Sequence, residues 1–169
     1  FLLLSRENNI SADSIKGSFA GAIGIAQFMP SSYREYAIDF DGDGMADLEN
    51  NVDDAIGSAS NYLKRHGWKR GESIVFPVSP QKPDGLSELT GKSKPNRTYG
   101  ELKKMGIKEQ FDLKDDTSVG LFELEGEAGV EYWMSLKNFY VITRYNPSNN
   151  YALAMVQLAD KIKALRSAQ

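Results

Sequence analysis

Three aspartates at alternating positions, Asp39, Asp41 and Asp43, form a pattern that could bind a metal ion. Carboxylates at this spacing, followed by a glycine at Gly44, match the first half of the EF-hand loop that binds Ca²⁺. The backbone carbonyl of Met45 would supply the next ligand of such a loop. Calcium is favoured over magnesium because the loop is flexible and offers only oxygen ligands. The alternative is a solvated turn, in which the three carboxylates would repel one another.

The second half of this loop departs from the EF-hand pattern. The position of the closing glutamate is occupied by Asn50, and Glu49 stands one place too early. An asparagine amide offers one neutral oxygen, so it cannot close the site in the same way. Two carboxylates follow slightly later, at Asp53 and Asp54. We therefore expect a calcium site of modest affinity that is closed by a residue outside the standard position.

A second pattern is the glycine-rich segment over residues 17–33. Small residues stand where an amphipathic helix would have bulky ones, at Gly17, Ala20, Gly21 and Gly24. Glycine inside a helix costs about 1 kcal/mol relative to alanine, so the pattern indicates that another backbone or a ligand comes close. Two polar residues, Ser18 and Gln27, lie among the apolar ones. These residues alone leave both a tight helix–helix crossing and a binding groove open.

Several long stretches of the chain, in the same order, closely resemble lytic transglycosylases of the membrane-bound lytic murein transglycosylase B family. The stretches are residues 18–24, 27–33, 54–62, 66–68, 138–146 and 151–155, and the resemblance is weak between about 70 and 130. Enzymes of this family cleave the glycan strands of bacterial peptidoglycan. The resemblance implies a lysozyme-like helical core. It also implies that Asp54 closes the calcium loop, with Asp53 as the alternative.

The resemblance assigns a set of residues to the sugar-binding groove. These substrate-binding residues are Ser18, Gln27, Phe28, Tyr62, Tyr145, Asn146 and Tyr151. The chemistry agrees, because sugars are held by aromatic faces and by neutral amides and hydroxyls. For each tyrosine alone, packing in the core is the simpler interpretation, and their joint match to the family is what favours a groove.

No catalytic residue is predicted within the chain. Cleavage of a glycosidic bond needs a carboxylic acid of raised pKa, and none of the glutamates considered lies in an apolar, glycine-lined setting: Glu7, Glu35, Glu123, Glu125, Glu127 and Glu131. The resemblance places the single catalytic glutamate of the family before Phe1. It implies that this acid acts on the MurNAc-GlcNAc bond and yields 1,6-anhydro-MurNAc. We therefore expect the chain alone to be inactive, and the alternatives are a non-catalytic calcium-stabilised peptidoglycan-binding module and a purely structural calcium-stabilised domain.

The elements that must position these residues are helices at both ends and a mixed middle. Helix patterns cover about residues 1–9, 19–29, 32–38, 53–66 and 150–167. Short strands are predicted at 73–78 and 119–124, a loop at 80–95, and a capping box at 98–101 before a short helix. The lone histidine, His66, ends a helix at Gly67, which favours a structural role. In the last helix, one stripe is predicted to be buried: Tyr151, Met155, Leu158, Ile162 and Leu165.

The predicted fold class is α+β, mainly α. A lysozyme-like core spans 1–69 and carries an EF-hand-like calcium loop at 39–54, a small mixed α/β insertion spans 70–132, and helices in 133–169 complete the core. The length of 169 residues allows one domain, or one domain with a small insertion. The net charge of -3 gives no reason to expect nucleic acid. No apolar run is long enough for a membrane span.

The expected setting follows from the chain's start and from the resemblance. The first residues read as a helix already under way and no methionine starts the chain, so we expect the C-terminal part of a longer protein. A lipid anchor upstream stays open. We expect a monomer that binds peptidoglycan glycan strands in the periplasm or at the outer membrane of a Gram-negative bacterium.

Overall fold

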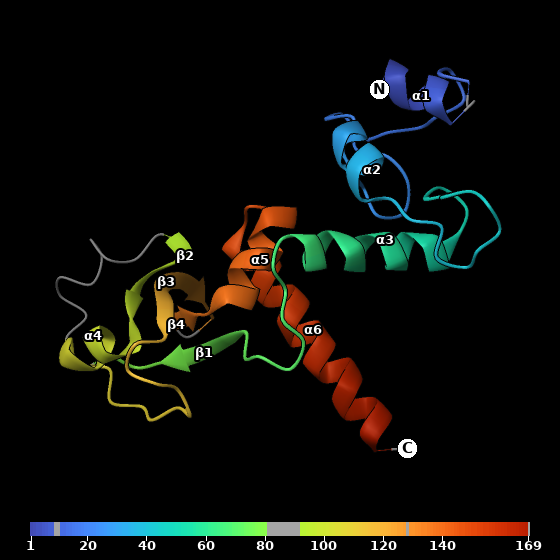
Figure 1. Ribbon diagram of the computed structural model, residues 1–169. Coiled ribbons are helices and arrows are strands. Elements are labelled where there is room, and N and C mark those ends of the chain that lie inside the picture. Colours follow the sequence, from blue (N-terminus) through green and yellow to red (C-terminus); the bar gives the residue numbers. More distant parts are fainter. Residues whose placement is uncertain (9–10, 81–91, 128, 169) are drawn as a thin grey trace. The chain divides into compact units, whose positions relative to one another are not determined.

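The computed structural model describes residues 1–8, 11–80, 92–127 and 129–168. Helices and one antiparallel sheet form an α+β fold, as the sequence predicts (Figure 1). The chain divides into two compact units, Phe1–His66 and Gly67–Gln169. No helix in the described ranges combines the length and the apolar character needed to cross a bilayer.

The first unit carries the helices α1 (Leu2–Glu7), α2 (Pro30–Tyr36) and α3 (Val52–Arg65). They confirm the helices predicted at 1–9, 32–38 and 53–66. Helix α3 is capped by Asn51, whose side-chain oxygen accepts hydrogen bonds from two backbone N–H groups of the first turn. It ends before Gly67, whose φ of 93° is the left-handed conformation that glycine adopts at low cost.

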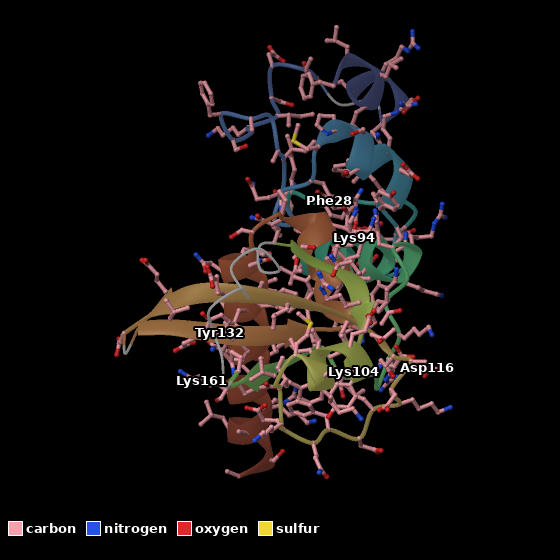
Figure 2. All side chains as sticks on the ribbon, turned by 90° about the vertical axis from the view of Figure 1, so that its left-hand side faces the viewer. Phe28, Lys94, Lys104, Asp116, Tyr132 and Lys161 are labelled. Carbon is pink, nitrogen blue, oxygen red and sulfur yellow. The ribbon has the colours of Figure 1, made fainter. Side chains whose placement is uncertain are left out.

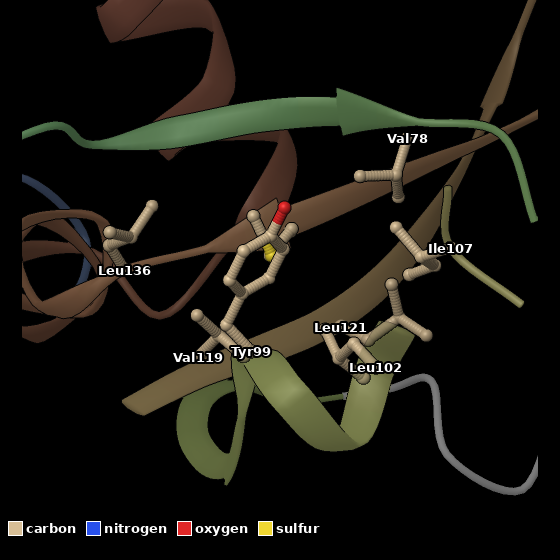
Figure 3. Close-up of a cluster of buried hydrophobic side chains, with 8 residues drawn as sticks. Val78, Tyr99, Leu102, Ile107, Val119, Leu121 and Leu136 are labelled. Atoms are coloured by element: carbon tan, nitrogen blue, oxygen red, sulfur yellow. The ribbon is translucent and has the colours of Figure 1, made fainter. Parts of the chain in front are cut away.

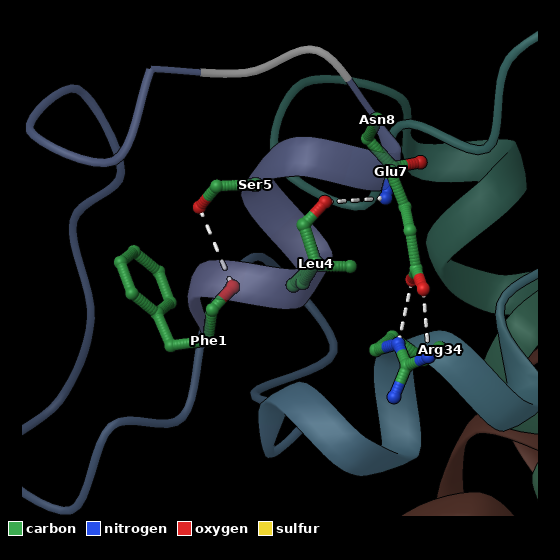
Figure 4. A network of polar contacts seen from close by, with 6 residues as sticks. All are labelled: Phe1, Leu4, Ser5, Glu7, Asn8 and Arg34. Atoms are coloured by element: carbon green, nitrogen blue, oxygen red, sulfur yellow. Dashed lines mark hydrogen bonds and ion pairs between the residues drawn. The ribbon is translucent and has the colours of Figure 1, made fainter.

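An ion pair joins the first two helices. Arg34 of α2 donates two hydrogen bonds to the carboxylate of Glu7, at 2.6 and 2.7 Å (Figure 4). Next to it, Asn8 caps α1 by donating from its side-chain amide to the carbonyl of Leu4 at 3.0 Å. Because the guanidinium binds both carboxylate oxygens, the pair fixes the orientation of the two side chains.

The helix predicted over residues 19–29 is wrong. The backbone there is left-handed at Gly21 (φ 85°), Gly24 (φ 69°) and Gln27 (φ 49°), which no right-handed helix can include. The segment instead forms a tight loop, in which Ile23 and Phe28 exchange two backbone hydrogen bonds at 2.9 and 3.1 Å. The glycines serve this loop geometry, so the interpretation as a helix–helix crossing is excluded for these residues.

The second unit is built on a four-stranded antiparallel sheet in the order β1-β4-β3-β2. Its strands are β1 (Val75–Val78), β2 (Lys92–Thr98), β3 (Ser118–Gly126) and β4 (Gly129–Ser135). Strands β1 and β3 confirm the strands predicted at 73–78 and 119–124. The loop predicted over 80–95 is wrong from Lys92 onward, and residues 81–91 of that prediction lie outside the described residues. An edge strand tolerates the proline and lysines that made β2 resemble a loop.

Helices cover both faces of this sheet. Helix α4 (Tyr99–Lys104) starts with the predicted capping box between Thr98 and Glu101. It packs on one face in a cluster of buried side chains (Figure 3): Val78, Tyr99, Leu102, Ile107, Val119, Leu121, Met134 and Leu136. Helices α5 (Lys137–Tyr145) and α6 (Asn149–Ser167) pack on the other face with a second cluster: Phe122, Phe139, Ile142, Ala152, Leu153 and Val156.

The buried stripe predicted for the last helix is wrong beyond Tyr151, which does pack against the second cluster. Four of its members are 45% to 69% exposed: Met155, Leu158, Ile162 and Leu165. The described residues of α6 that are buried are Ala152, Leu153 and Val156, which lie beside the predicted stripe. The assignment of residues 133–169 to the core of residues 1–69 stays a prediction, since α5 and α6 share their described core with the sheet.

Candidate functional site

The aspartate loop brings three carboxylates together in the first unit. Asp39, Asp41 and Asp43 each offer an oxygen, and these oxygens lie within 4.8 Å of one another. The carboxylate of Asp39 also accepts hydrogen bonds from the N–H groups of Gly42 (2.7 Å) and Gly44 (2.8 Å), which curl the loop around it. Exposed carboxylates at such spacing repel one another, and a divalent cation among them would offset that repulsion.

Asp54 holds this loop against helix α3. Its side chain is fully buried, and its two oxygens accept N–H bonds from Phe40 (2.7 Å) and Asp47 (2.9 Å), one on each limb of the loop. It does not belong to the cluster of three aspartates. No ion pair to Asp54 occurs among the described residues, so backbone donors alone compensate the buried carboxylate. Asp53, the alternative ligand, is exposed.

Sequence reasoning missed a residue that links the loop to the helix, Asn51. Its side-chain oxygen accepts bonds from the N–H groups of Asp53 (3.0 Å) and Asp54 (3.2 Å), and its amide donates to Asp41 at 2.7 Å. The available signal was an asparagine directly before the helix, a preferred N-cap residue. The same residue therefore starts α3 and orients one of the clustered carboxylates.

The far end of the aspartate loop meets the glycine-rich segment at Leu48. The carbonyl of Leu48 accepts a hydrogen bond from Ile25 at 2.7 Å, and a side chain on Gly24 would place its Cβ 2.4 Å from that oxygen. The hydroxyl of the buried Tyr33 donates to the carbonyl of Ala46 at 2.6 Å and accepts from Leu48. Burial raises the pKa of Tyr33, which keeps this hydroxyl protonated. A backbone therefore does come close to Gly24, as the glycine pattern indicates.

The two polar residues predicted from this segment, Ser18 and Gln27, are both exposed. The hydroxyl of Ser18 accepts a hydrogen bond from Ala22 at 3.1 Å, and the amide of Gln27 donates to Gly24 at 2.9 Å. Gln27 is the non-glycine residue with positive φ in the described part of the chain. Such a conformation costs about 1–3 kcal/mol and recurs at functional sites. Because the side chains of Ser18 and Gln27 are exposed, their further donor and acceptor positions can serve a ligand.

The aromatic residues predicted in the first unit are buried. Phe28 and Tyr62 are 3% and 8% exposed. The ring of Tyr62 stacks on His66 with centroids 4.0 Å apart and meets the edge of Tyr36 at 4.8 Å. The imidazole of His66 also lies 2.9 Å from the carbonyl of Tyr62, in keeping with its expected structural role. These rings form a packed cluster that also includes Phe28, whose centroid lies 5.6 Å from that of Tyr62, and a sugar stacked on Tyr62 stays a prediction.

The other three predicted residues lie on the second unit, around the turn from α5 to α6. Tyr145 and Asn146 end α5, and the carbonyl of Asn146 accepts a hydrogen bond from Ser148 at 2.8 Å. Tyr151 is half-buried against the second cluster. Asn138 on α5 was quoted only as part of a family stretch, yet its buried amide makes hydrogen bonds to Lys69 and Glu72 that fix the start of α5.

Comparison with known proteins now identifies the family. The chain matches the transglycosylase SLT domain family over residues 1–160. The chain belongs to this family. It is 42% identical over 166 residues to membrane-bound lytic murein transglycosylase B of Escherichia coli strain K12. The aligned region covers 98% of this chain and 45% of that protein. The chain therefore spans about half the length of this relative.

Solved structures of transglycosylases agree with this assignment. Soluble lytic transglycosylase SltB1 of Pseudomonas aeruginosa has a TM-score of 0.90 at 44% identity, covering 98% of this chain and 55% of that one. Escherichia coli Slt35 in complex with calcium has a TM-score of 0.87 at 42% identity, covering 99% and 52%. Pseudomonas aeruginosa SltB3 in complex with NAG-anhNAM-pentapeptide has a TM-score of 0.79 at 34% identity, covering 96% and 44%.

Within this transglycosylase SLT domain, Glu7 is a poor candidate for the catalytic acid. The hydrogen bonds and the charge of Arg34 hold its pKa below the usual range. A general acid needs the opposite, a pKa raised toward neutrality. This agrees with the expectation that no catalytic acid lies in the chain, which stays a prediction for the other glutamates.

Proposed function

We propose that this chain is part of a peptidoglycan lytic transglycosylase that cleaves the MurNAc-GlcNAc bond and forms 1,6-anhydro-MurNAc. Membership of nearly the whole chain in the transglycosylase family carries this proposal. The SltB3 complex supports it, because its ligand is an anhydro-sugar peptide. The catalytic glutamate is proposed to lie in a part of the protein before Phe1, so the described residues would supply the groove and not the acid.

The groove residues have distinct proposed roles. Gln27 and Ser18 would donate and accept hydrogen bonds to the reacting sugar, because both side chains are exposed on a loop whose backbone is fixed. On the second unit, Tyr145, Asn146 and Tyr151 would contact the glycan strand through a hydroxyl, an amide and an aromatic ring. Phe28 and Tyr62 would support the loop that carries Gln27, with any sugar contact limited to their exposed edges.

Calcium is the proposed structural cofactor, bound by Asp39, Asp41, Asp43, the carbonyl of Met45 and Asp54. Three observations fit: the clustered carboxylates, the curled loop, and a buried carboxylate without a cationic side chain among the described residues. The calcium complex of Slt35 supports the choice of ion. A calcium ion there would neutralise the cluster and tie the loop to α3, and no catalytic step is assigned to it.

The proposed setting is the periplasm or the outer membrane of a Gram-negative bacterium, with glycan strands as the partner of a monomer. Membrane-bound lytic murein transglycosylase B of Escherichia coli supports this setting, because its name describes a membrane-bound enzyme that acts on murein. A lipid anchor upstream of the described chain would be compatible with it.

The test is the release of anhydromuropeptides from purified peptidoglycan by the enzyme that contains this chain. We expect Gln27→Ala to lower turnover about 10–100-fold, the effect of one lost neutral hydrogen bond in the transition state, with little change in melting temperature. Gln157→Ala on the exposed surface of α6 is the matched control and should retain full turnover. The 169-residue chain alone should release no product.

Two outcomes would overturn this proposal. Absence of anhydromuropeptides with the whole enzyme, while the protein still binds peptidoglycan, would favour the non-catalytic binding module. Equal turnover of Gln27→Ala and Gln157→Ala would show that Gln27 serves the loop and not the sugar.

A further inference from the structure

Helix α6 presents apolar side chains on two sides. Its first half packs on the sheet through Ala152, Leu153 and Val156. With 3.6 residues per turn, the apolar stripe predicted from the sequence lies on nearly the opposite side of the helix. Four side chains of this stripe are 45%, 55%, 48% and 69% exposed: Met155, Leu158, Ile162 and Leu165. A continuous apolar stripe of this kind on a protein surface marks an interaction site.

The second half of α6 is exposed on all sides in the described part of the chain. Every residue from Gln157 to Ala168 is exposed, and Figure 1 shows this end of α6 extending away from the strands. Helices of fewer than about 12–15 residues are marginal in water on their own. A partner that packs on the exposed stripe would supply the stabilisation that this half of the helix needs.

The spacing of the exposed stripe fits one partner helix. Its four residues follow one another in steps of three, four and three: Met155, Leu158, Ile162 and Leu165. Steps of three and four are the repeat of the seam along which two helices of a coiled coil meet. A β-branched residue such as Ile162, alternating with leucines, favours a pair of helices over larger bundles.

A hollow beside this seam has the form that receives a side chain from a facing helix. It measures about 450 Å³ and is lined by Ala159, Ile162, Lys163, Arg166 and Ser167. The first four of these stand at positions i, i+3, i+4 and i+7 of the helix. Four residues of one helix form the hole into which a side chain of the other helix inserts. The surface therefore suits another helix better than an extended peptide.

The charges beside the seam indicate the chemistry of that helix. Lys161, labelled on α6 in Figure 2, and Arg166 flank the seam on its two sides. Both are exposed, and neither forms an ion pair among the residues that the structure describes. Pairing of two copies of α6, in either direction, would bring the cations of one copy against those of the other. This repulsion disfavours a second copy and favours a helix with carboxylates beside its apolar seam.

We propose that the exposed stripe of α6 is a docking surface for a helix from the part of the same protein outside these 169 residues. The aligned region covers 45% of membrane-bound lytic murein transglycosylase B of Escherichia coli, so a protein of that length has more than half of its residues elsewhere. The docking helix carries aspartate or glutamate beside its seam. The inference concerns assembly and not chemistry, so it is independent of the proposed transglycosylase activity.

Hydrogen exchange of backbone amides tests this proposal by comparing the whole protein with the 169-residue chain. Residues 157–168 should exchange at least about 100-fold more slowly in the whole protein, because an unpacked helix end opens at almost no cost. The amides of α5 serve as the internal reference for a folded second unit. Equal exchange of residues 157–168 in both proteins would overturn the proposal. Slow exchange already in the 169-residue chain would also overturn it, and a dependence on concentration would then assign the surface to a second copy.

Variants of the whole protein test the seam itself. Leu158→Ser should speed the exchange of residues 157–168 about 10- to 100-fold, because it removes a leucine from the proposed interface. Gln157→Ser is the matched control at the neighbouring exposed position outside the seam, and its effect should stay within about 2-fold. Equal effects of the two variants would overturn the docking surface.

A second pair of variants tests the charge of the docking helix. Lys161→Glu would place a carboxylate against the proposed carboxylates and should speed exchange about 2- to 5-fold, with a smaller effect at high salt. Lys108→Glu makes the same change at an exposed position after α4 and should leave the exchange of residues 157–168 unchanged. Equal effects of these two variants would refute the acidic partner.

Release of anhydromuropeptides separates this inference from the proposed function. An active enzyme in which residues 157–168 exchange as fast as in the 169-residue chain would keep the proposed function and refute the docking surface. A whole protein that protects these residues but releases no product would refute the proposed function and keep the docking surface.

Discussion

Asp54→Asn is the substitution that most directly tests how the aspartate loop is held. The side chain is fully buried and each of its oxygens accepts one backbone N–H, from Phe40 at 2.7 Å and from Asp47 at 2.9 Å. Asparagine has nearly the same shape but keeps only one acceptor oxygen. Its amide nitrogen would face one of the two N–H donors, which leaves that donor without a partner.

The expected cost follows from these two bonds. A buried N–H left unsatisfied costs about 1–3 kcal/mol, and replacing a charged acceptor by a neutral one weakens the other bond by about 1 kcal/mol. The free energy of unfolding should therefore fall by about 2–4 kcal/mol. For a protein of this size, each kcal/mol lowers the melting temperature by about 2–4 °C.

The assay is urea unfolding with and without calcium. A site with a dissociation constant of roughly 10⁻⁴ M should stabilise the wild-type protein by about 2.7 kcal/mol at an ion concentration one hundred times higher. Asp54→Asn should lose most of this calcium-dependent gain as well as the stability of the calcium-free protein. A wild-type protein whose unfolding midpoint ignores millimolar calcium would refute the metal site.

Asp53→Asn is the matched control, because it makes the same change one residue earlier on the exposed side of α3. It should change the calcium-free stability by less than about 0.5 kcal/mol, as surface substitutions usually do. It should also leave the calcium response intact. If Asp53→Asn removes that response and Asp54→Asn does not, the closing ligand is Asp53 and our reasoning from Asp54 is wrong.

Two further predictions concern the same unit. Gly24→Ala should destabilise the protein by about 2–5 kcal/mol, because the residue has φ 69° and its Cβ would lie 2.4 Å from the Leu48 carbonyl oxygen. Gly21→Ala is the control, with φ 85° and open space around it, and should cost only about 1–2 kcal/mol. Equal losses of unfolding free energy for the two variants in urea would contradict the close approach at Gly24. The Glu7–Arg34 pair should add stability only above the ordinary pKa of Glu7, 4.5, and lose it as the pH falls through the lowered pKa in the folded protein. The difference in melting temperature between wild type and Glu7→Gln should therefore shrink as the pH falls below 4.5. A difference that stays constant with pH would contradict a stabilising ion pair.

The aspartate loop and the helix that follows it could be predicted because their signals are local. Spacing places the oxygens of Asp39, Asp41 and Asp43 in one turn, and the capping box at Thr98 depends on residues three positions apart. The glycine-rich segment could not be predicted in the same way. Its apolar spacing is compatible with a helix, but Gly24 is required by the carbonyl of Leu48, which lies outside the segment. Only the folded chain shows that approach.

The site residues show the same division. Ser18 and Gln27 are exposed, in agreement with a groove, whereas Phe28 and Tyr62 are packed in an aromatic cluster. A matching stretch identifies a residue but says nothing of which neighbours cover its ring.

The aspartate loop contacts the segment that carries Gln27, and through this contact a structural ion could affect catalysis. Asp54 fixes both limbs of the loop, and the loop then presents the carbonyl of Leu48 to Ile25 and Gly24. These contacts adjoin the turn in which the N–H and the side-chain amide of Gln27 both donate to the carbonyl of Gly24. A calcium ion among the aspartates would stabilise this arrangement without touching the substrate. Loss of the ion should therefore reduce turnover through the position of Gln27, because a hydrogen-bond donor displaced by about 1 Å can cost a hundredfold in rate.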